Sequence, residues 1–374
     1  MPSIPQELIN AIVSHLPMAS LKTCSLVDPT LRGPCQRILL RSISLKCWLS
    51  SWPEPPNLDA ALGLLEESPH VAPYITHLTI RLQLPICAHL SALQLILRKL
   101  DNVTWCMVDG YYRRLEWTSL LTFGLSAALA EFLGRESLRT LHLRRIRGFP
   151  AAIFRRTAPR LSLEDVEIAE SVQDPIVPPG RAIDDLALGR GTDDLYPLLA
   201  SSQFHSQTAS LRRLSISPHN DKCVALILSV AASLQELQFQ DKGLESRSTL
   251  MLPPLPALKS IEFLIGFPGR RTPPVLDTIN SILTSGTSPN LENITLSFSW
   301  YGLTHSPSPD AKSLAALDSA LASHPNAPAI HWRMNFRLMD FKSAKQLSEL
   351  AERVRREMWN AKKMERLVVE EYQE

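Results

Sequence analysis

The sequence predicts an α/β protein: a short three-helix module, followed by an irregular solenoid with parallel strands inside and helices outside. Three observations support this prediction, namely an excess of leucine, a recurring apolar pattern, and proline-bounded helical stretches in the first 45 residues. Hydrophobic residues make up 45% of the 374 positions, and the formal net charge is only +2. This composition excludes disorder as the global state, and it disfavours a nucleic-acid-binding protein that depends on a large basic field.

Residues 1–41 are expected to form the helical module. Apolar residues at helical spacing predict a helix over residues 4–16, and Pro17 ends it because a proline forces the preceding residue out of the α region. A second helix fits residues 20–27. Asp28-Pro29 then starts a third helix, which Gly33-Pro34 is expected to break or kink. Three such short helices bury little surface alone, so the module must dock on the rest of the chain or on a partner.

The residues of this module carry a resemblance to a known family. The segments Pro5-Gln6-Glu7-Leu8-Ile9, Ile12, Ser14-His15-Leu16-Pro17, Leu21 and Cys24-Ser25-Leu26-Val27 together resemble an F-box. Residues 36–45 are similar to the segment that follows the F-box in fungal F-box-like proteins, although Leu31 stands where many F-boxes have an aromatic residue. The resemblance implies a module that binds the adaptor subunit of an SCF-type cullin–RING ubiquitin ligase. It places the adaptor contact on Pro5, Leu8, Ile9, Ile12, Leu16, Pro17, Leu21 and Val27. The residues alone also fit an alternative interpretation, in which the module is a helical cap on the solenoid that follows.

The pattern apolar-x-x-apolar-x-apolar recurs along residues 42–374 and predicts the strands of the solenoid. Its copies begin at Ile75, Leu138, Leu163, Ile183, Leu211, Leu234, Leu258 and Leu291. From Leu138 the starting positions step by 25, 20, 28, 23, 24 and 33 residues, close to the period of leucine-rich repeats, which share this strand core. Alternation of strand and helix requires right-handed crossovers and therefore parallel strands.

Helices are expected between these strands. The apolar spacing predicts them over residues 57–67, 221–232 and 312–323, and from Thr272 to the glycine at position 286. Residues 341–374 are expected to form an amphipathic capping helix rather than a free coiled-coil helix, and Leu367-Val368-Val369 fits a final edge strand. Residues 82–117 are not placed in the array, although 103–108 fit a further strand.

Strand side chains alternate between the two faces of a sheet, so the residues between the apolar positions should line the concave face. We expect the target to contact Thr79, His142, Glu167, Ser215, Gln238, Glu262 and Thr295, with Ala187 in the same ladder. The surface is polar, of mixed sign and without an aromatic row, which disfavours a base-stacking nucleic-acid platform and suits a protein or peptide ligand. A plain solvated face is the alternative for any single residue.

No motif for bond chemistry is present. The chain lacks a phosphate-binding loop, a metal-ligand cluster and a nucleophile elbow, so we expect no catalytic residue, no metal and no cofactor. Adjacent acidic pairs such as Glu164-Asp165 point to opposite faces of a strand and cannot converge on one atom. The six scattered cysteines, the absence of a secretory signal and the shortness of every apolar run predict a cytoplasmic or nuclear protein that does not enter a membrane.

These observations favour a substrate-recognition subunit of a ubiquitin ligase. The F-box-like module would bind the adaptor subunit, and the solenoid would bind an unidentified target protein. Two alternatives stay open: a leucine-rich-repeat interaction scaffold that is not coupled to ubiquitination, and an enzyme whose site is too dispersed to recognise in one sequence.

Overall fold

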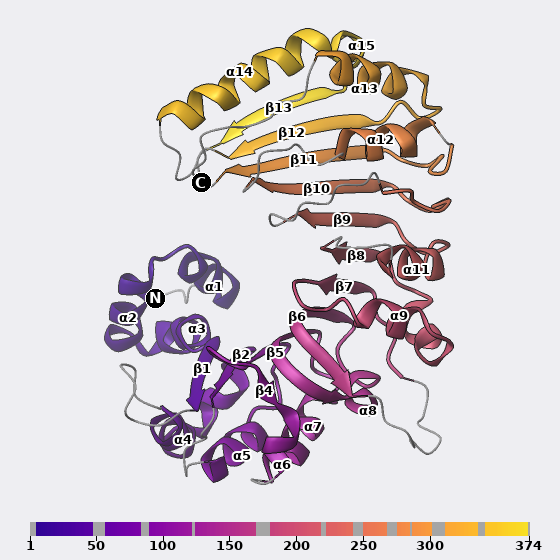
Figure 1. Cartoon of the computed structure of the whole chain (residues 1–374). Coiled ribbons are helices and arrows are strands. Elements are labelled where there is room, and N and C mark those ends of the chain that lie inside the picture. The colour runs from indigo at the N-terminus through magenta and orange to yellow at the C-terminus, as the bar shows by residue number, and fades with distance from the viewer. Residues whose placement is uncertain are drawn as a thin grey trace. The chain divides into compact units, whose positions relative to one another are not determined.

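The structure is a computed structural model that describes residues 5–47, 57–83, 90–121, 124–169, 180–217, 222–241, 250–267, 275–284, 286–300, 311–335 and 341–372. The chain divides into two compact units, residues 1–181 (unit 1) and residues 182–374 (unit 2). Each unit contains a parallel sheet with helices, so the mixed α/β class with parallel strands is confirmed (Figure 1). The predicted boundary after residue 41 lies within unit 1, between its third helix and its first strand.

Unit 1 begins with three helices, α1 (Gln6–Ser14), α2 (Met18–Val27) and α3 (Pro29–Leu39). They enclose a small core of Ile9, Val13, Leu21 and Cys35. The carboxylate of Asp28 caps α3, accepting a hydrogen bond of 2.8 Å from the backbone N–H of Thr30.

Helix α3 runs through Pro34 without the predicted break. A proline ring clashes with the N–H and the Cβ of the residue before it, and Gly33 has no Cβ. Packing of Cys35, Leu31 and Ile38 in the module core then stabilises the helix, although Pro34 cannot donate a backbone hydrogen bond.

The sheet of unit 1 follows the helical module. Its parallel strands pair in the order β1 (Ser42–Cys47), β2 (His77–Leu82), β3 (Trp105–Asp109), β5 (Thr140–Pro150) and β6 (Arg160–Ala169), and β4 (Leu115–Glu116) pairs with β5. The connecting helices are α4 (Leu58–Glu67), η1 (Pro69–Tyr74), α5 (Leu90–Lys99), α6 (Trp117–Leu121), α7 (Leu125–Leu133) and α8 (Ala151–Phe154). The sequence pattern missed β1. In the region that it left unplaced, β3 confirms the further strand suggested over residues 103–108, and α5 and β4 are additional elements.

Unit 2 repeats the same strand–helix arrangement. Its strands are β7 (Asp185–Leu188), β8 (Arg213–Ile216), β9 (Glu236–Asp241), β10 (Ser260–Phe267), β11 (Asn293–Trp300), β12 (Ala329–Asn335) and β13 (Leu367–Tyr372), paired in chain order and parallel. Its helices are α9 (Leu195–Ala200), η2 (Ser202–Phe204), α10 (His205–Thr208), α11 (Lys222–Ser229), α12 (Val275–Thr284), α13 (Ala311–Ser323), α14 (Phe341–Glu357) and α15 (Trp359–Lys363).

The C-terminal segment is more divided than predicted. The expected helix over residues 341–374 ends at Glu357, and the short helix α15 follows it. The chain then forms β13, which confirms the predicted edge strand at Leu367-Val368-Val369. The β-branched residues of this strand favour an extended backbone over continuation of the helix.

Most successive repeats within each unit are joined by a shared carbonyl. The carbonyl oxygen of Arg41 accepts hydrogen bonds from the N–H groups of Thr76 (2.9 Å) and His77 (3.0 Å). The carbonyl of Arg212 accepts two such bonds in the same way, from Gln235 and Glu236, at 2.9 Å each. This arrangement starts neighbouring strands at the same level, so their apolar side chains stack in rows across the sheet. One such row is Leu45, Ile80, Val108, Leu143 and Leu163.

The end of unit 2 depends on a buried cap. Asp318 of α13 is 4% exposed, and its two carboxylate oxygens accept hydrogen bonds of 2.9 Å from the backbone N–H groups of Asn360 and Ala361. We predict that Asp318→Ala lowers the free energy of unfolding by about 2 kcal/mol, because both N–H groups at the start of α15 lose their acceptor. Urea denaturation followed by circular dichroism measures the change.

The matched control is Asp277→Ala, which removes an exposed carboxylate from the first turn of α12. It should change the free energy of unfolding by no more than about 0.5 kcal/mol. Equal effects of the two substitutions would contradict the capping role of Asp318.

Candidate functional site

One face of the unit 2 sheet buries the apolar side chains, and we call the opposite face the outward face. The outward face carries a row of half-buried residues in register. From β7 to β12 the row runs Ala187, Ser215, Gln238, Glu262, Thr295 and His331. Four of the residues predicted to contact the target, Ser215, Gln238, Glu262 and Thr295, are therefore neighbours on one surface. The in-register pairing of parallel strands brings them together, because each occupies the same position in its repeat.

Hydrogen bonds link this row across four strands. Ser215 Oγ donates to Gln238 Oε1 at 2.7 Å, and Gln238 Nε2 donates to Glu262 Oε2 at 2.8 Å. From the other side, Ser297 Oγ donates to Glu262 Oε1 at 3.0 Å. Both carboxylate oxygens of Glu262 are held by neutral donors, and within the described ranges this carboxylate has no ion-pair partner. Its negative charge therefore remains on the face.

A hollow of about 260 Å³ lies on the same surface. Its charged lining residues are Asp185, Arg213, Glu236 and Glu262. Arg213 lies between two of the acids, with its Nε 3.8 Å from Asp185 Oδ2 and 3.8 Å from Glu236 Oε2. Because three carboxylates surround one guanidinium, the hollow is electronegative and offers hydrogen-bond acceptors to a ligand.

The corresponding face of unit 1 holds Thr79 and His142 but not Glu167. Thr79, Met107, His142 and Ser162 form one row across β2, β3, β5 and β6. The sequence pattern took Leu163 as the first apolar position of this strand's repeat. In the structure, Leu161 and Leu163 pair with Leu141 and Leu143. Ser162 therefore occupies the place assigned to Glu167.

Glu167 lies beyond an irregularity shared by β5 and β6. Arg145 has φ +55° and Asp165 has φ +57°, and the pairing shifts register between Ile146 and Phe149. The side chain of Glu167 is exposed and lies 3.7 Å from the Nε of Arg147. The apolar alternation continues on both sides of this irregularity, which explains why the sequence pattern chose the wrong frame.

An aromatic group on the unit 1 face was missed by the sequence pattern. The Trp105 ring lies between His77 and His142, with ring centroids 5.7 Å and 5.1 Å apart. The expected polar face without an aromatic row did not include Trp105, because residues 82–117 were not placed in the array. Trp105 and Met107 alternate with the buried residues Cys106 and Val108, and this alternation in the sequence would have identified the strand.

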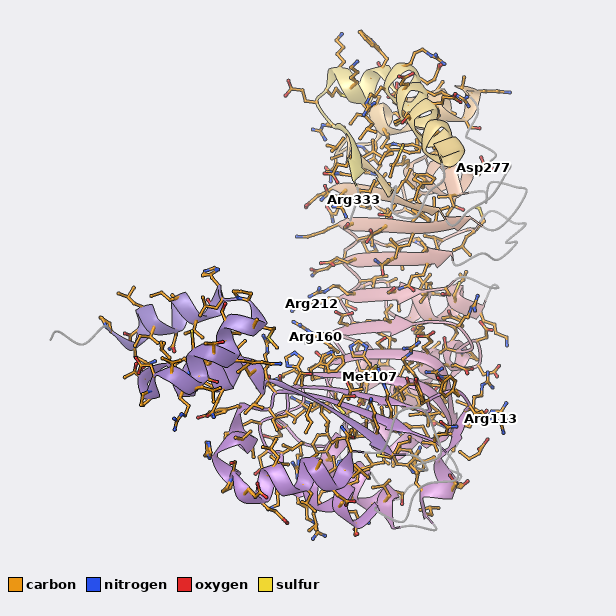
Figure 2. The ribbon with its side chains drawn as sticks, turned by 90° about the vertical axis from the view of Figure 1, so that its left-hand side faces the viewer. Met107, Arg113, Arg160, Arg212, Asp277 and Arg333 are labelled. Carbon is orange, nitrogen blue, oxygen red and sulfur yellow. The ribbon has the colours of Figure 1, made fainter. Side chains whose placement is uncertain are left out.

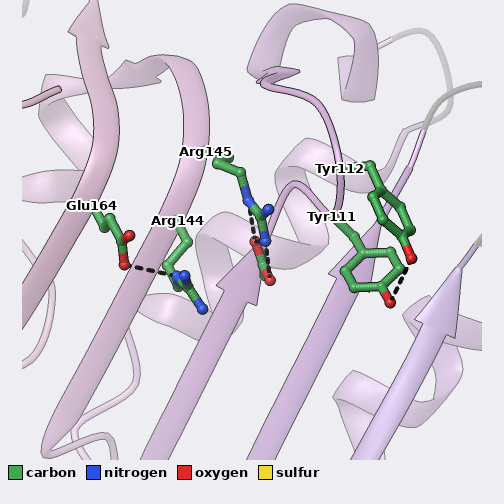
Figure 3. Close-up of polar contacts among 6 residues, drawn as sticks. Tyr111, Tyr112, Arg144, Arg145 and Glu164 are labelled. Carbon is green, nitrogen blue, oxygen red and sulfur yellow. Dashed lines mark hydrogen bonds and ion pairs between the residues drawn. The ribbon is translucent and has the colours of Figure 1, made fainter. Parts of the chain in front are cut away.

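A second polar group lies at the end of β3 and in the middle of β5 and β6 (Figure 3). The buried carboxylate of Asp109 accepts hydrogen bonds from Arg145, whose Nη2 lies 2.7 Å from both of its oxygens. Arg144 pairs with Glu164 at 2.9 Å. Gly110 is required at this point, because a Cβ there would lie 2.3 Å from the carbonyl oxygen of Arg145. We interpret the Asp109–Arg145 pair as structural, since each charge neutralises the other.

The predicted adaptor-binding residues differ in exposure. Pro5, Leu8, Ile12, Pro17 and Val27 are exposed, Leu16 is half-buried, and Ile9 and Leu21 are buried in the module core. Ile9 and Leu21 thus hold the three helices together. The side chains available to a partner are the exposed ones.

His77 should make the stability of unit 1 depend on pH. Burial, and then the positive charge of Arg41, lower the pKa of His77 below its ordinary value. The unfolded chain therefore binds a proton more readily, and stability should fall as pH decreases below about 6.5, down to the folded pKa. We predict that His77→Gln removes part of this loss, measured by urea denaturation at pH 7.5 and pH 5.0. An identical loss of stability in both proteins would contradict the assignment to His77.

Comparison with known proteins does not identify a ligand for these surfaces. No family model matches the sequence, and no curated protein matches it. Among the helices that the structure describes, none is long and apolar enough to cross a membrane. In the same part of the chain, no group of three or more His, Cys, Asp or Glu side chains is arranged to hold a metal ion. The candidate site is therefore defined by the two sheet faces and the exposed side of the helical module.

Proposed function

We propose that this protein is a substrate-recognition subunit of an SCF-type cullin–RING ubiquitin ligase. In this proposal the helical module is an F-box that binds the adaptor subunit, and the strand–helix repeats are leucine-rich repeats that bind a target protein. The observation that carries the proposal is the set of large apolar side chains left exposed on the module, in the segment that resembles an F-box.

These side chains are costly to leave in water. Leu8 and Ile12 are 55% and 57% exposed and share one face of α1, because they are four residues apart. Met18, Leu26 and Val27 of α2 are also exposed. The module already has its own core, so these residues are not needed to hold its helices together. Exposed apolar side chains gathered on so small a unit are typical of a protein-binding surface.

The module also contacts its own unit through a different helix. The guanidinium of Arg37 in α3 lies over the ring of Tyr74, with Cζ 5.6 Å from the ring centroid. A cap on the repeats would bury its apolar residues against them, whereas Leu8 and Ile12 remain exposed. This difference favours an external partner for α1 over a purely capping role.

The proposed contribution to ubiquitination is positioning. The chain would perform no bond chemistry and would need no cofactor. By holding a target close to the charged ubiquitin-conjugating enzyme, it would raise the effective concentration of the target lysine. The polar sheet faces support this role, since their charges and hydrogen-bond groups suit a protein ligand. A cytoplasmic or nuclear location is part of the same proposal.

The proposal is tested by co-purification of the full chain with the recombinant adaptor subunit. We expect a stoichiometric complex, and we expect the double variant Leu8→Asp/Ile12→Asp to bind at least about 100-fold more weakly. Burial of each apolar side chain contributes roughly 1.5–3 kcal/mol, so loss of two exceeds a 100-fold change in affinity. Isothermal titration calorimetry measures the dissociation constants.

The matched control is Leu228→Asp, which places the same charge at an exposed leucine of α11 in unit 2. This variant should bind the adaptor subunit as the unmodified chain does. If the unmodified chain forms no complex, the ligase proposal is wrong and an uncoupled interaction scaffold takes its place.

A further inference from the structure

We propose that the outward face of the unit 1 sheet binds an acidic peptide segment, with Trp105 as its apolar anchor and Arg81 and Arg160 as its carboxylate partners. The inference deepens the proposed function, on which it rests in taking the peptide to be part of the target. It concerns a surface separate from the adaptor-binding side of α1.

The centre of this face holds three rings and a methionine side chain. Trp105 is half-buried between His77 and His142, and Met107 lies next to His142 in the same row. Thr76 Oγ1 lies 2.9 Å from His77 Nδ1 and fixes that ring. Tryptophan is the residue most enriched at the energetic centres of protein interfaces, because it buries a large area with little loss of conformational freedom.

Positive charge surrounds this centre. Arg160 is exposed at the start of β6, and Met107 and Arg160, both labelled in Figure 2, lie in neighbouring rows of the face. The side chain of Arg81 is half-buried, and its guanidinium lies over the Tyr111 ring, 5.3 Å from the ring centroid. Among the described residues, neither guanidinium is paired with a carboxylate.

The acidic residues of this face are already neutralised. Asp109 is bound by Arg145, and Glu164 is bound by Arg144. The charge that remains is therefore positive, in contrast to the unit 2 face with its unpaired Glu262. An arginine guanidinium binds a carboxylate through two parallel hydrogen bonds, which makes acidic side chains the complementary ligand.

The spacing of the two arginines suits an extended peptide. Arg81 and Arg160 are three strands and four residues apart in the sheet, which corresponds to about 20 Å. An extended chain of about six residues covers this distance. A nucleic acid fits less well, because its affinity depends on neutralising many phosphates, and this face offers few unpaired cations.

The test is fluorescence anisotropy with the full chain and a labelled peptide of about eight residues, composed of glutamates with two central leucines. The probe should bind, and its glutamine analogue should bind at least about tenfold more weakly. Arg81→Gln/Arg160→Gln should also weaken binding about tenfold or more, and Trp105→Phe should weaken it less than Trp105→Ala. Circular dichroism confirms that each variant is folded.

The matched control is Arg98→Gln, which removes an exposed arginine from helix α5 of the same unit, outside the sheet face. It should leave binding of the acidic probe unchanged. The inference is overturned if the double variant of Arg81 and Arg160 binds as well as the unmodified chain. Tighter binding of a uridine oligonucleotide than of the acidic probe would overturn it as well.

The two proposals fail separately. A chain that binds the adaptor subunit but not the acidic probe loses only this inference. A chain that binds the acidic probe but not the adaptor subunit loses the ligase proposal, while the peptide-binding face stands. Leu8→Asp/Ile12→Asp should leave probe binding unchanged, because α1 is not part of this face.

Discussion

The shared carbonyl between successive repeats is the constraint on which the rest of each unit depends. At most junctions one carbonyl receives two backbone N–H groups of the next repeat, as at Arg41 and Arg212, and this fixes where the next strand begins. Apart from the irregularity of β5 and β6, the apolar positions then meet their equivalents, and the buried rows follow. The same register decides which side chains face outward, so the chemistry of the faces is a consequence of backbone pairing.

This pairing gives the two units faces of different character. In unit 2, a chain of hydrogen bonds through Gln238 holds Glu262 in place without neutralising it. In unit 1, Arg144 and Arg145 neutralise the acidic residues. The rings of Trp105 and two histidines lie near Arg81 and Arg160, which have no carboxylate partner among the described residues. The formal net charge of +2 for the whole chain conceals this difference. A low net charge of the whole chain is therefore compatible with two faces of opposite local charge.

The sequence predicted the repeating strands because their apolar positions recur at near-constant intervals. It failed where that signal is ambiguous. Alternation continues through the irregularity at Asp165, so Glu167 was assigned to the place of Ser162. Trp105 was missed because its strand is short and stands among unplaced residues. In the helical module, the spacing of apolar residues includes both Leu8 and Ile9. Only the packing shows that Ile9 is buried and Leu8 is exposed.

The shared-carbonyl contacts use no side chain. The positions that supply these carbonyls are occupied by residues of different chemistry: Arg41, Thr76, Thr104, Asp184, Arg212, Gln235 and Lys259. Any residue can provide a carbonyl oxygen, so away from local requirements such as Gly110 and Asp318 the repeats depend mainly on apolar volume at the buried rows. Descendants of such a chain can exchange nearly all surface residues, and with them their ligands, while the scaffold is inherited intact.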